Sequence, residues 1–377
     1  MKIQDIKELC TGCGACSSSC PQSCIKMEYD EEGFYYPQIN KDECIECGMC
    51  ERSCHMLNHI DSNTRIKSYY GWLSDKDERY NSSSGGAFYA MAKYVLDKGG
   101  IVFGAAFDYE KRVLKHVSSE EVELEELRKS KYVESYMGQI IKEVKNQIQN
   151  NRLVLFCGTP CQVSGLLHVI RGTPQNLITV DFVCHGVPSS RLFIEHLSSI
   201  HNSERLVSID FRSKKHGWTG KNIELITKTK TKTRTRHFTL DSYYYGFMTC
   251  NAFLRKSCYD CQFREKHCGD ITIADFWGYY KYDKSINDEK GISLIMGNTD
   301  KGVNIIESME GFDLFVLDNK YSDYAFEKAN MTGYLDRRNK FYQIYKNDGF
   351  EKAARKTYMR NHYILWLKWL KRKILKL

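Results

Sequence analysis

The spacing of apolar residues after position 80 switches repeatedly between helical and strand periodicity. Short apolar runs predict buried strands over residues 101–107, 113–117, 153–156 and 177–183. Between them, apolar side chains at three- and four-residue intervals predict helices over residues 85–96, 122–129, 139–148, 162–170 and 191–200. Helices that alternate with short buried strands are typical of an α/β fold, so we expect a sheet with a parallel core.

The region after residue 200 has the pattern of antiparallel strands, which makes the expected fold mixed α/β (α+β). From Thr227 to Arg236, threonine alternates with lysine or arginine, so that in a strand the five cations share one face. This favours a solvated edge hairpin whose charges oppose aggregation, and an anion- or partner-binding surface is the alternative. We expect strands over residues 207–212, 222–227, 227–238, 271–274 and 292–296.

Residues 59–80 are polar and charged without clear periodicity, which predicts a linker. This linker separates a cysteine-rich N-terminal segment from the α/β body and its hairpin region. The expected units are residues 1–58, the linker at 59–80, the two parts of the body at 81–150 and 151–300, and a helical C-terminal region at 301–377.

The formal charge of +8 is concentrated at the C-terminus. Residues 352–377 hold nine Lys and Arg and no Asp or Glu, so the rest of the chain is close to neutral, which argues against nucleic acid as a partner. The tail from Tyr363 to Leu377 would form a helix with a tryptophan-bearing apolar face beside a cationic face. Such a helix suits peripheral attachment to the inner face of a membrane, and docking on the body is the alternative.

Cysteine use points to bound metal. Residues 1–10 contain no secretory signal and no stretch of ~18 apolar residues could span a bilayer, so we expect a cytoplasmic protein. Reducing thiol pools oppose disulfides there, and metal ligation becomes the default explanation for 16 cysteines.

Two N-terminal cysteine runs share one spacing of two, two and three intervening residues, which is the bacterial pattern for two 4Fe-4S clusters. Because the last cysteine of each run ligates the other cluster, Cys54 would complete the first cluster and Cys20 the second. Zinc is the alternative and fits two identical runs of four poorly. Cys24 lies outside the pattern and is expected to be a packed or spare thiol. The expected ligand sets are Cys10, Cys13, Cys16 and Cys54, and Cys44, Cys47, Cys50 and Cys20.

Two glycine-containing motifs stand where ligands bind in α/β proteins. Ser83, Ser84, Gly85 and Gly86 precede a predicted helix, whose free N–H groups suit an anion such as a phosphate. Gly158, Thr159, Pro160 and Cys161 join a predicted strand to a helix, which places Cys161 in the first helical turn at the carboxyl end of the strand. A helix N-terminus favours the thiolate form of such a cysteine.

A second group of thiols follows in the body. Cys258 and Cys261 form a compact chelating pair, and together with Cys268 and either Cys161 or Cys184 they could hold a third 4Fe-4S cluster. Zinc and a redox dithiol are the alternatives. Cys184 and its neighbour His185 could also form a catalytic pair, or Cys184 could be a core residue beside a structural or substrate-facing histidine.

These motifs, in this order, resemble the coenzyme F420 hydrogenase/dehydrogenase beta-subunit family, and the bacterial branch associated with polysaccharide biosynthesis in particular. The resemblance covers most of the chain to about residue 300. It implies a flavin, typically FAD, between the iron–sulfur module and the α/β body, with Ser83–Gly86 on its phosphate or ribityl groups and Gly158–Cys161 bordering it. Arg212 and Lys214 would contact anionic groups of flavin or substrate, and Asp275 is a further candidate.

The expected function is an iron–sulfur flavoprotein oxidoreductase that exchanges electrons between a ferredoxin-like protein and a small substrate, such as a sugar or glycan precursor. A flavin converts two-electron transfer into single-electron steps, and the clusters carry those electrons one at a time. No GxGxxG motif supports direct use of a nicotinamide. The alternatives are a non-catalytic electron-transfer subunit of a larger redox complex, or a metal-stabilised interaction protein in a glycan-assembly complex.

Overall fold

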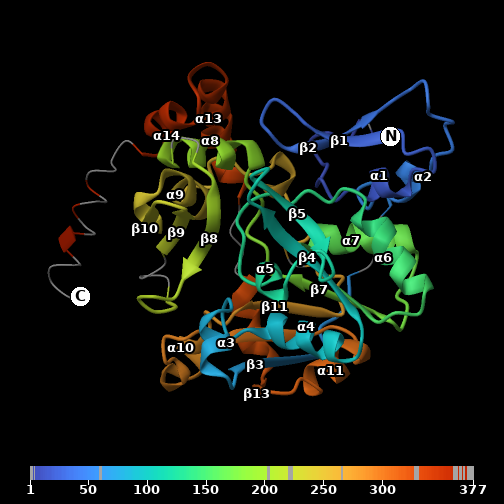
Figure 1. Cartoon of the computed structure of the whole chain (residues 1–377), viewed down its shortest axis with the longest axis vertical. Coiled ribbons are helices and arrows are strands. Elements are labelled where there is room, and N and C mark those ends of the chain that lie inside the picture. The colour runs from blue at the N-terminus through green and yellow to red at the C-terminus, as the bar shows by residue number, and fades with distance from the viewer. Residues whose placement is uncertain are drawn as a thin grey trace.

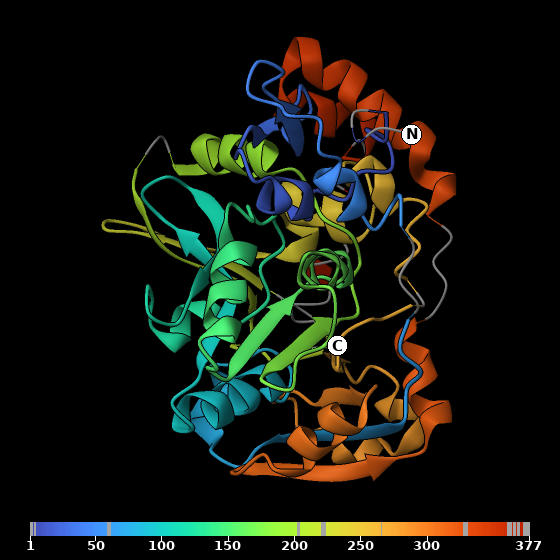
Figure 2. The same ribbon diagram turned by 90° about the vertical axis from the view of Figure 1, so that its right-hand side faces the viewer.

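A computed structural model describes residues 3, 5–58, 62–201, 204–219, 224–264, 266–326, 331–359, 364, 367 and 370–371. An N-terminal iron–sulfur-type module lies beside α6 and α7 of a larger α/β body, and the C-terminal helices α13 and α14 lie on the same side of the molecule (Figures 1 and 2). Within the described part of the chain, no helix is long and apolar enough to cross a membrane.

The N-terminal module is built from two short helices and a hairpin. The two cysteine runs contain α1 and α2, and Gly14 and Gly48, with φ of 74° and 66°, precede these helices in the left-handed conformation that glycine adopts without strain. Antiparallel β1 and β2 connect the runs. The elements are α1 (Ala15–Ser19), β1 (Ile25–Tyr29), β2 (Tyr35–Ile39) and α2 (Met49–Arg52).

The body is organised around an eight-stranded sheet in the order β13-β3-β12-β11-β7-β6-β4-β5. The adjacent strands β4, β6, β7 and β11 are parallel, which confirms the expected parallel core, and the outer pairs are antiparallel. The strands are β3 (Lys67–Leu73), β4 (Ile101–Asp108), β5 (Val113–Ser118), β6 (Val154–Gly158), β7 (Leu177–Phe182), β11 (Ile271–Asp275), β12 (Ser293–Gly297) and β13 (Phe312–Leu317).

Helices cover both faces of the sheet. Val102 and Leu155 pack with α4 and α11 on one face, while their strand neighbours Phe103 and Phe156 pack with α6 and α7 on the other. This alternation explains why the central strands are apolar throughout. The helices around this sheet are α3 (Lys76–Tyr80), α4 (Ala87–Asp97), α5 (Leu124–Leu127), α6 (Ile140–Gln149), α7 (Pro160–Ile170) and α11 (Asp300–Glu307).

A second, aromatic-rich core lies between a small antiparallel sheet and the C-terminal helices. Phe193, Phe211, Tyr243 and Phe253 are buried there. The small sheet has the order β10-β9-β8. The elements are α8 (Ser190–His201), β8 (Leu206–Ser213), β9 (Glu224–Thr229), β10 (Thr233–His237), α9 (Ser242–Met248), α13 (Leu335–Asp348) and α14 (Phe350–Thr357), and two short helices lie elsewhere, α10 (Tyr279–Tyr282) and α12 (Asn319–Ser322).

Three expectations from the sequence are corrected. The supposed linker at residues 59–80 contributes β3, which pairs with β12 and β13, and α3. The Thr227–Arg236 ladder is not one strand, because β9 ends at Thr229 and β10 begins at Thr233, so the hairpin turn falls inside the ladder. The C-terminal region is not purely helical, since it contains β13.

Two further expectations meet limits in the structure. The helix expected over residues 122–129 is only the four residues of α5, because Arg128 is extended and Lys129 has a φ of 73°. The amphipathic tail at residues 360–377 lies largely outside the described residues.

Candidate functional site

A cavity of about 680 Å³ lies at the carboxyl ends of the parallel strands. The residues that follow β6, β7 and β11 line it, as expected for an open α/β sheet, and its size is within the range of small-molecule and cofactor sites. Thr11 and Gly12 of the N-terminal module also line it. One cavity therefore borders both parts of the molecule.

The loop from Ser83 to Gly86 forms part of the cavity wall. Ser83, Ser84 and Gly86 line the cavity, and Gly86 begins α4 with a φ of 91° and no side-chain cap. Gly85 lies behind them, where a Cβ would stand 2.2 Å from the carbonyl oxygen of Gly71. The structure thus places the N-terminus of α4 at the cavity, where the Ala87 N–H already donates to Ser293 Oγ at 3.3 Å, and not every residue of the motif reaches the cavity.

The second glycine motif is shaped by a capping box. The Thr159 side chain accepts from the Gln162 backbone N–H, while the Gln162 side chain accepts from the Thr159 backbone N–H at 2.9 Å. With Pro160 at the first helical position, this fixes the start of α7. Gly158, Thr159 and Cys161 line the cavity, and Pro160 does not.

Arg212 and Asp275 form a buried ion pair in the cavity wall. Asp275 also accepts from the Ser84 hydroxyl and from Trp218 Nε1, at 3.3 Å for the latter. Only one terminal nitrogen of Arg212 is used, since the buried Nη2 has no hydrogen-bond partner among the described residues. An unpaired buried guanidinium N–H in a cavity wall is suited to an anionic group of a ligand.

Lys214 is placed differently from Arg212. Its ammonium group donates to the carbonyl oxygens of Arg79 and Ser84, both at 2.6 Å, and it does not belong to the cavity lining. Burial, followed by the nearby Arg79 charge, lowers the pKa of Lys214 to about 7. Lys214 therefore supports the serine loop from behind rather than facing a ligand.

Four thiols from three segments gather at the inner end of the cavity. Cys161, Cys184 and Cys261 line it, and the Cβ of Cys258 would be 3.3 Å from a Cβ at Gly186. Burial, and then the nearby thiols of Cys258, Cys161 and Cys261, raise the pKa of Cys184 well above its usual value. Cys161 and Cys184, the two candidates for the fourth ligand of a third cluster, thus both lie with the Cys258/Cys261 pair.

Cys268 lies apart from the thiols of Cys184, Cys258 and Cys261, although the Cys161 thiol is near enough to contribute to its raised pKa. It is buried in the core beneath α7, where its thiol donates to the carbonyl oxygen of Pro160 at 3.6 Å. We therefore revise the expected third ligand set by replacing Cys268 with Cys184. His185 does not pair with Cys184 either, because its Nε2 contacts Asn251 Oδ1 at 2.7 Å.

The N-terminal thiols lie near one another as the two proposed crossed sets would require. Burial and the thiols of Cys13, Cys10 and Cys54 raise the pKa of Cys16, which places the four together. Cys20 instead lies with the second run: burial raises the pKa of Cys50, and the Cys20 thiol contributes to that increase.

The alternative of zinc finds no compact site. In the described residues, no three His, Cys, Asp or Glu side chains converge on a point where one metal ion could sit. Thiolates at the corners of a cubane each bind a different iron, so they stand farther apart than the ligands of one ion.

The first N-terminal set lies next to the third. A Cβ at Gly165 of α7 would be 2.8 Å from Cys13 Sγ, and Cys161 stands one turn earlier on the same helix. His55, which follows the second run, has its Nδ1 3.9 Å from Cys13 Sγ and its Nε2 3.2 Å from Thr11 Oγ1. The thiols of the N-terminal module thus approach the cavity through α7.

A buried arginine holds the module against the body. Arg255 is fully buried, forms an ion pair with Glu134, and donates to the carbonyl oxygens of Cys10 at 3.1 Å and Tyr35 at 2.6 Å. A Cβ at Gly12 would stand 2.6 Å from Arg255 Nη2. Sequence reasoning assigned no role to either charge, and no local motif marks Glu134.

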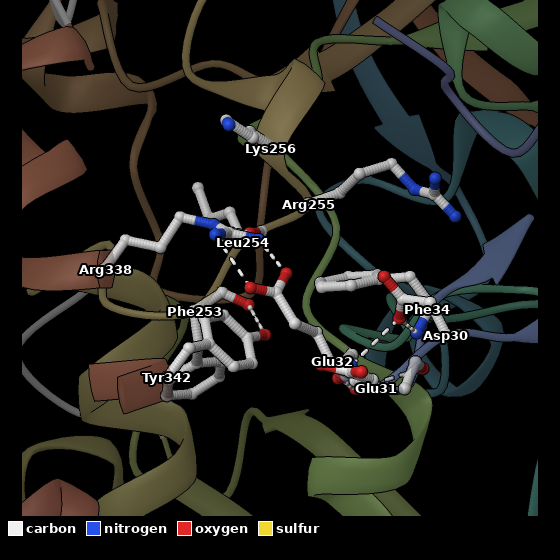
Figure 3. A network of polar contacts seen from close by, with 12 residues as sticks. Asp30, Glu31, Glu32, Phe34, Phe253, Leu254, Arg255, Lys256, Arg338 and Tyr342 are labelled. Atoms are coloured by element: carbon white, nitrogen blue, oxygen red, sulfur yellow. Dashed lines mark hydrogen bonds and ion pairs between the residues drawn. The ribbon is translucent and has the colours of Figure 1, made fainter. Parts of the chain in front are cut away.

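The β1–β2 hairpin makes a second contact with the body (Figure 3). Its turn is shaped by Asp30, whose carboxylate accepts from the backbone N–H groups of Glu32 and Phe34 at 3.0 Å. Glu32 then pairs with Arg338 of α13, which also donates to the carbonyl oxygen of Leu254 at 2.9 Å. Together the two contacts fix the module in one position on the body.

Comparison with known proteins agrees with this architecture. Residues 151–319 match the model of the C-terminal region of the coenzyme F420 hydrogenase/dehydrogenase beta subunit, and residues 9–56 match the 4Fe-4S dicluster domain. The C-terminal half of the chain is thus similar to this beta-subunit family, and its N-terminal segment is similar to the dicluster domain. The protein is an iron–sulfur electron-transfer protein, and members of this family are subunits of redox enzymes.

Individual relatives are distant or short in extent. Residues of this chain are 36% identical over 62 positions to an iron–sulfur subunit of the CoB–CoM heterodisulfide reductase of Methanocaldococcus jannaschii, a match that covers 13% of this chain and 9% of that protein. A chain of the F420-reducing [NiFe] hydrogenase complex from Methanosarcina barkeri is 15% identical, with a TM-score of 0.45, and the alignment covers 74% of this chain and 93% of that one.

Proposed function

We propose that the protein is an iron–sulfur flavoprotein oxidoreductase in which electrons pass between a partner protein and a small substrate. The observation that carries this proposal is the shared cavity, lined at once by Thr11 and Gly12 of the dicluster module, by four cysteines of the body and by the serine loop. A flavin bound there would convert two-electron chemistry into single-electron steps.

The residues present fit a flavin nucleotide. The N-terminus of α4, whose Gly86 N-cap has no side chain, and the unpaired Nη2 of Arg212 would provide donors for a pyrophosphate or other anionic group. The serine loop is held in place by hydrogen bonds from Lys214 to Ser84 O and between the Ser83 and Ser130 hydroxyls, at 2.6 and 3.0 Å. FAD is the flavin that we propose, because the motifs resemble those of FAD-binding family members.

We propose three 4Fe-4S clusters in series. The set with exposed Cys47 is outermost, the Cys10 set comes next, and Cys161, Cys184, Cys258 and Cys261 hold the cluster beside the cavity. The order rests on the approach of Cys13 to α7, which carries Cys161 at its start. In this arrangement a ferredoxin-like partner meets the outer end and the substrate meets the flavin.

Anaerobic purification followed by iron, sulfide and flavin analysis tests this assignment. We expect one flavin and about twelve irons per chain, at four irons per cubane. Absence of flavin from protein with a full iron complement would contradict the flavoprotein assignment and favour a non-catalytic role in electron transfer within a larger complex. A content of about eight irons per chain would contradict the proposed third cluster.

The substrate is tested separately. We propose a small molecule such as a sugar or glycan precursor, supported by the resemblance to the polysaccharide-associated branch of the family. Chemically reduced protein would be mixed anaerobically with sugar nucleotides or with coenzyme F420, and reoxidation of the flavin would be followed by absorbance. Reoxidation by the deazaflavin alone would contradict the glycan proposal.

We also propose that the tail attaches the protein to the inner face of the cytoplasmic membrane. Support comes from the composition of residues 360–377, which combine tryptophan, leucine and lysine. Sedimentation with anionic liposomes should fall when residues 360–377 are deleted, and equal binding of both forms would contradict the proposal.

A further inference from the structure

Cys24 lies outside the ligand pattern, yet its thiol contacts a proposed ligand of the outer cluster. Its Sγ is 3.4 Å from Cys20 Sγ, and both side chains are buried. The Cys44 thiol also lies near Cys24. One thiol beyond the four of the second set therefore borders two members of that set.

The β1–β2 hairpin fixes the position of this thiol. Cys24 immediately precedes β1, and its carbonyl oxygen accepts from the backbone N–H of Asn40, at the end of β2, at 2.8 Å. The side chain packs in the core of the module with Ile25 and Met27. The thiol is therefore held in place against Cys20.

The other cysteine run has no such thiol. The residue four positions after Cys54 is Asn58, whose amide donates to the carbonyl oxygens of Glu51 at 2.6 Å and Cys54 at 3.2 Å. Two runs with identical cysteine spacing thus differ at this position: one side chain contacts a sulfur, and the other contacts backbone oxygens. This difference indicates that the Cys24 side chain is placed for contact with the cluster ligands rather than for packing of the turn.

We propose that Cys24 is an auxiliary thiol of the outer cluster, whose S–H donates a hydrogen bond to the Cys20 thiolate and raises the reduction potential of that cluster. Hydrogen bonds to ligand sulfurs are among the factors that set cluster potentials, because they stabilise the more negative reduced state. An electron is then held at the outer cluster, close to exposed Cys47, where a partner protein can reach it. This inference rests on the proposed two-cluster module.

The test compares Cys24→Ala, which removes the donor, with Cys24→Ser, which keeps a donor of similar size. Full-length protein is purified anaerobically, its iron is measured, and the clusters are titrated potentiometrically with detection by electron paramagnetic resonance. We expect both variants to keep all their iron. One cluster signal should move to a more negative potential in Cys24→Ala and should be at least partly restored in Cys24→Ser.

Cys250→Ala is the matched control, since Cys250 is also a buried thiol but lies in the aromatic core of the body. Unchanged potentials in Cys24→Ala would overturn the proposal. Loss of four irons from both Cys24 variants would overturn it as well, because Cys24 would then be a ligand. Wild-type protein without iron would instead contradict the proposed function itself.

Discussion

The thiols of the N-terminal module and those beside the cavity are assembled in different ways. All eight ligands proposed for the module lie between Cys10 and Cys54, and two turns at Gly14 and Gly48 shape both runs. The third set takes Cys161 from the start of α7, Cys184 from the loop after β7, and Cys258 and Cys261 from a later loop. Local turns shape the two N-terminal sets, whereas the sheet must be folded before the proposed third set can come together.

This difference leads to a prediction about Cys184. Cys184→Ser should remove the cluster beside the cavity and lower the iron content by about four per chain, because a serine is a poor substitute for a thiolate ligand. The iron of the N-terminal module should remain, since its ligands belong to another part of the chain. Iron analysis and the number of reducible clusters measure this.

Cys268→Ser is the control for Cys184→Ser. Its thiol contacts the Pro160 carbonyl oxygen in the core, so the substitution should leave the iron content unchanged. Loss of four irons from Cys268→Ser, with full iron in Cys184→Ser, would restore the original ligand set and contradict the revised one.

The same contrast explains what could be predicted from the sequence. The spacing of the two N-terminal runs predicted a 4Fe-4S dicluster segment, which the comparison with known domains supports. The apolar runs at 101–107, 153–156 and 177–183 predicted β4, β6 and β7 because these strands are buried on both faces. Cys184 and Cys161 could only be offered as alternatives, because which loops meet at a sheet edge depends on strand order.

The two missed features of the fold have a similar cause. In β3, Tyr69 and Tyr70 on opposite faces are both buried, since each packs into a separate hydrophobic cluster, so no alternation of polar and apolar residues marks the strand. The hairpin turn between Thr229 and Thr233 contains neither glycine nor proline, and the alternating ladder runs through it unchanged. Local periodicity cannot reveal either feature.

The junction between the two regions should be sensitive to Glu134. Glu134→Gln leaves Arg255 as a buried charge without its ion-pair partner, which typically costs about 3–5 kcal/mol. We expect the free energy of unfolding to fall by that order, as measured by anaerobic denaturant titration. Glu8→Gln is a matched control, because Glu8 pairs with the adjacent Lys256 at the surface and should contribute little. Equal effects of the two substitutions would contradict a buried junction.

A pH-dependent contribution should be confined to the body. His196 is fully buried, with Nε2 2.9 Å from Asp241 Oδ2 and Nδ1 3.5 Å from Glu351 Oε1. Burial alone would lower its pKa, but Asp241 and Glu351 outweigh burial and raise the pKa to about 9. Because the unfolded value is about 6.5, the stabilisation is complete below that pH and is lost as the pH rises through 9.

The expected size of this effect is up to about 3 kcal/mol, at 1.36 kcal/mol per pKa unit. The free energy of unfolding is measured from pH 6 to 9.5 for the wild type and for His196→Gln, and the difference between the two should decrease by this order. The comparison is needed because Lys214, whose pKa is lowered to about 7, titrates in the same range in both proteins with the opposite sign. A difference that does not change with pH would contradict the proposed role of the His196 charge.

The smallest predicted effect separates flavin binding from cluster binding. Arg212→Lys keeps the positive charge beside Asp275 but removes the planar fork and its unpaired Nη2, so a bound anionic group would lose one charge-assisted hydrogen bond. Such a bond is worth about 1.5–3 kcal/mol, which corresponds to a flavin dissociation constant raised roughly ten-fold or more. Equilibrium titration of flavin-stripped protein measures it, and iron content provides the internal control. Unaltered flavin affinity would exclude Arg212 from the flavin site, whereas parallel loss of flavin and iron would mean that the cavity and the thiol set beside it fold as one unit.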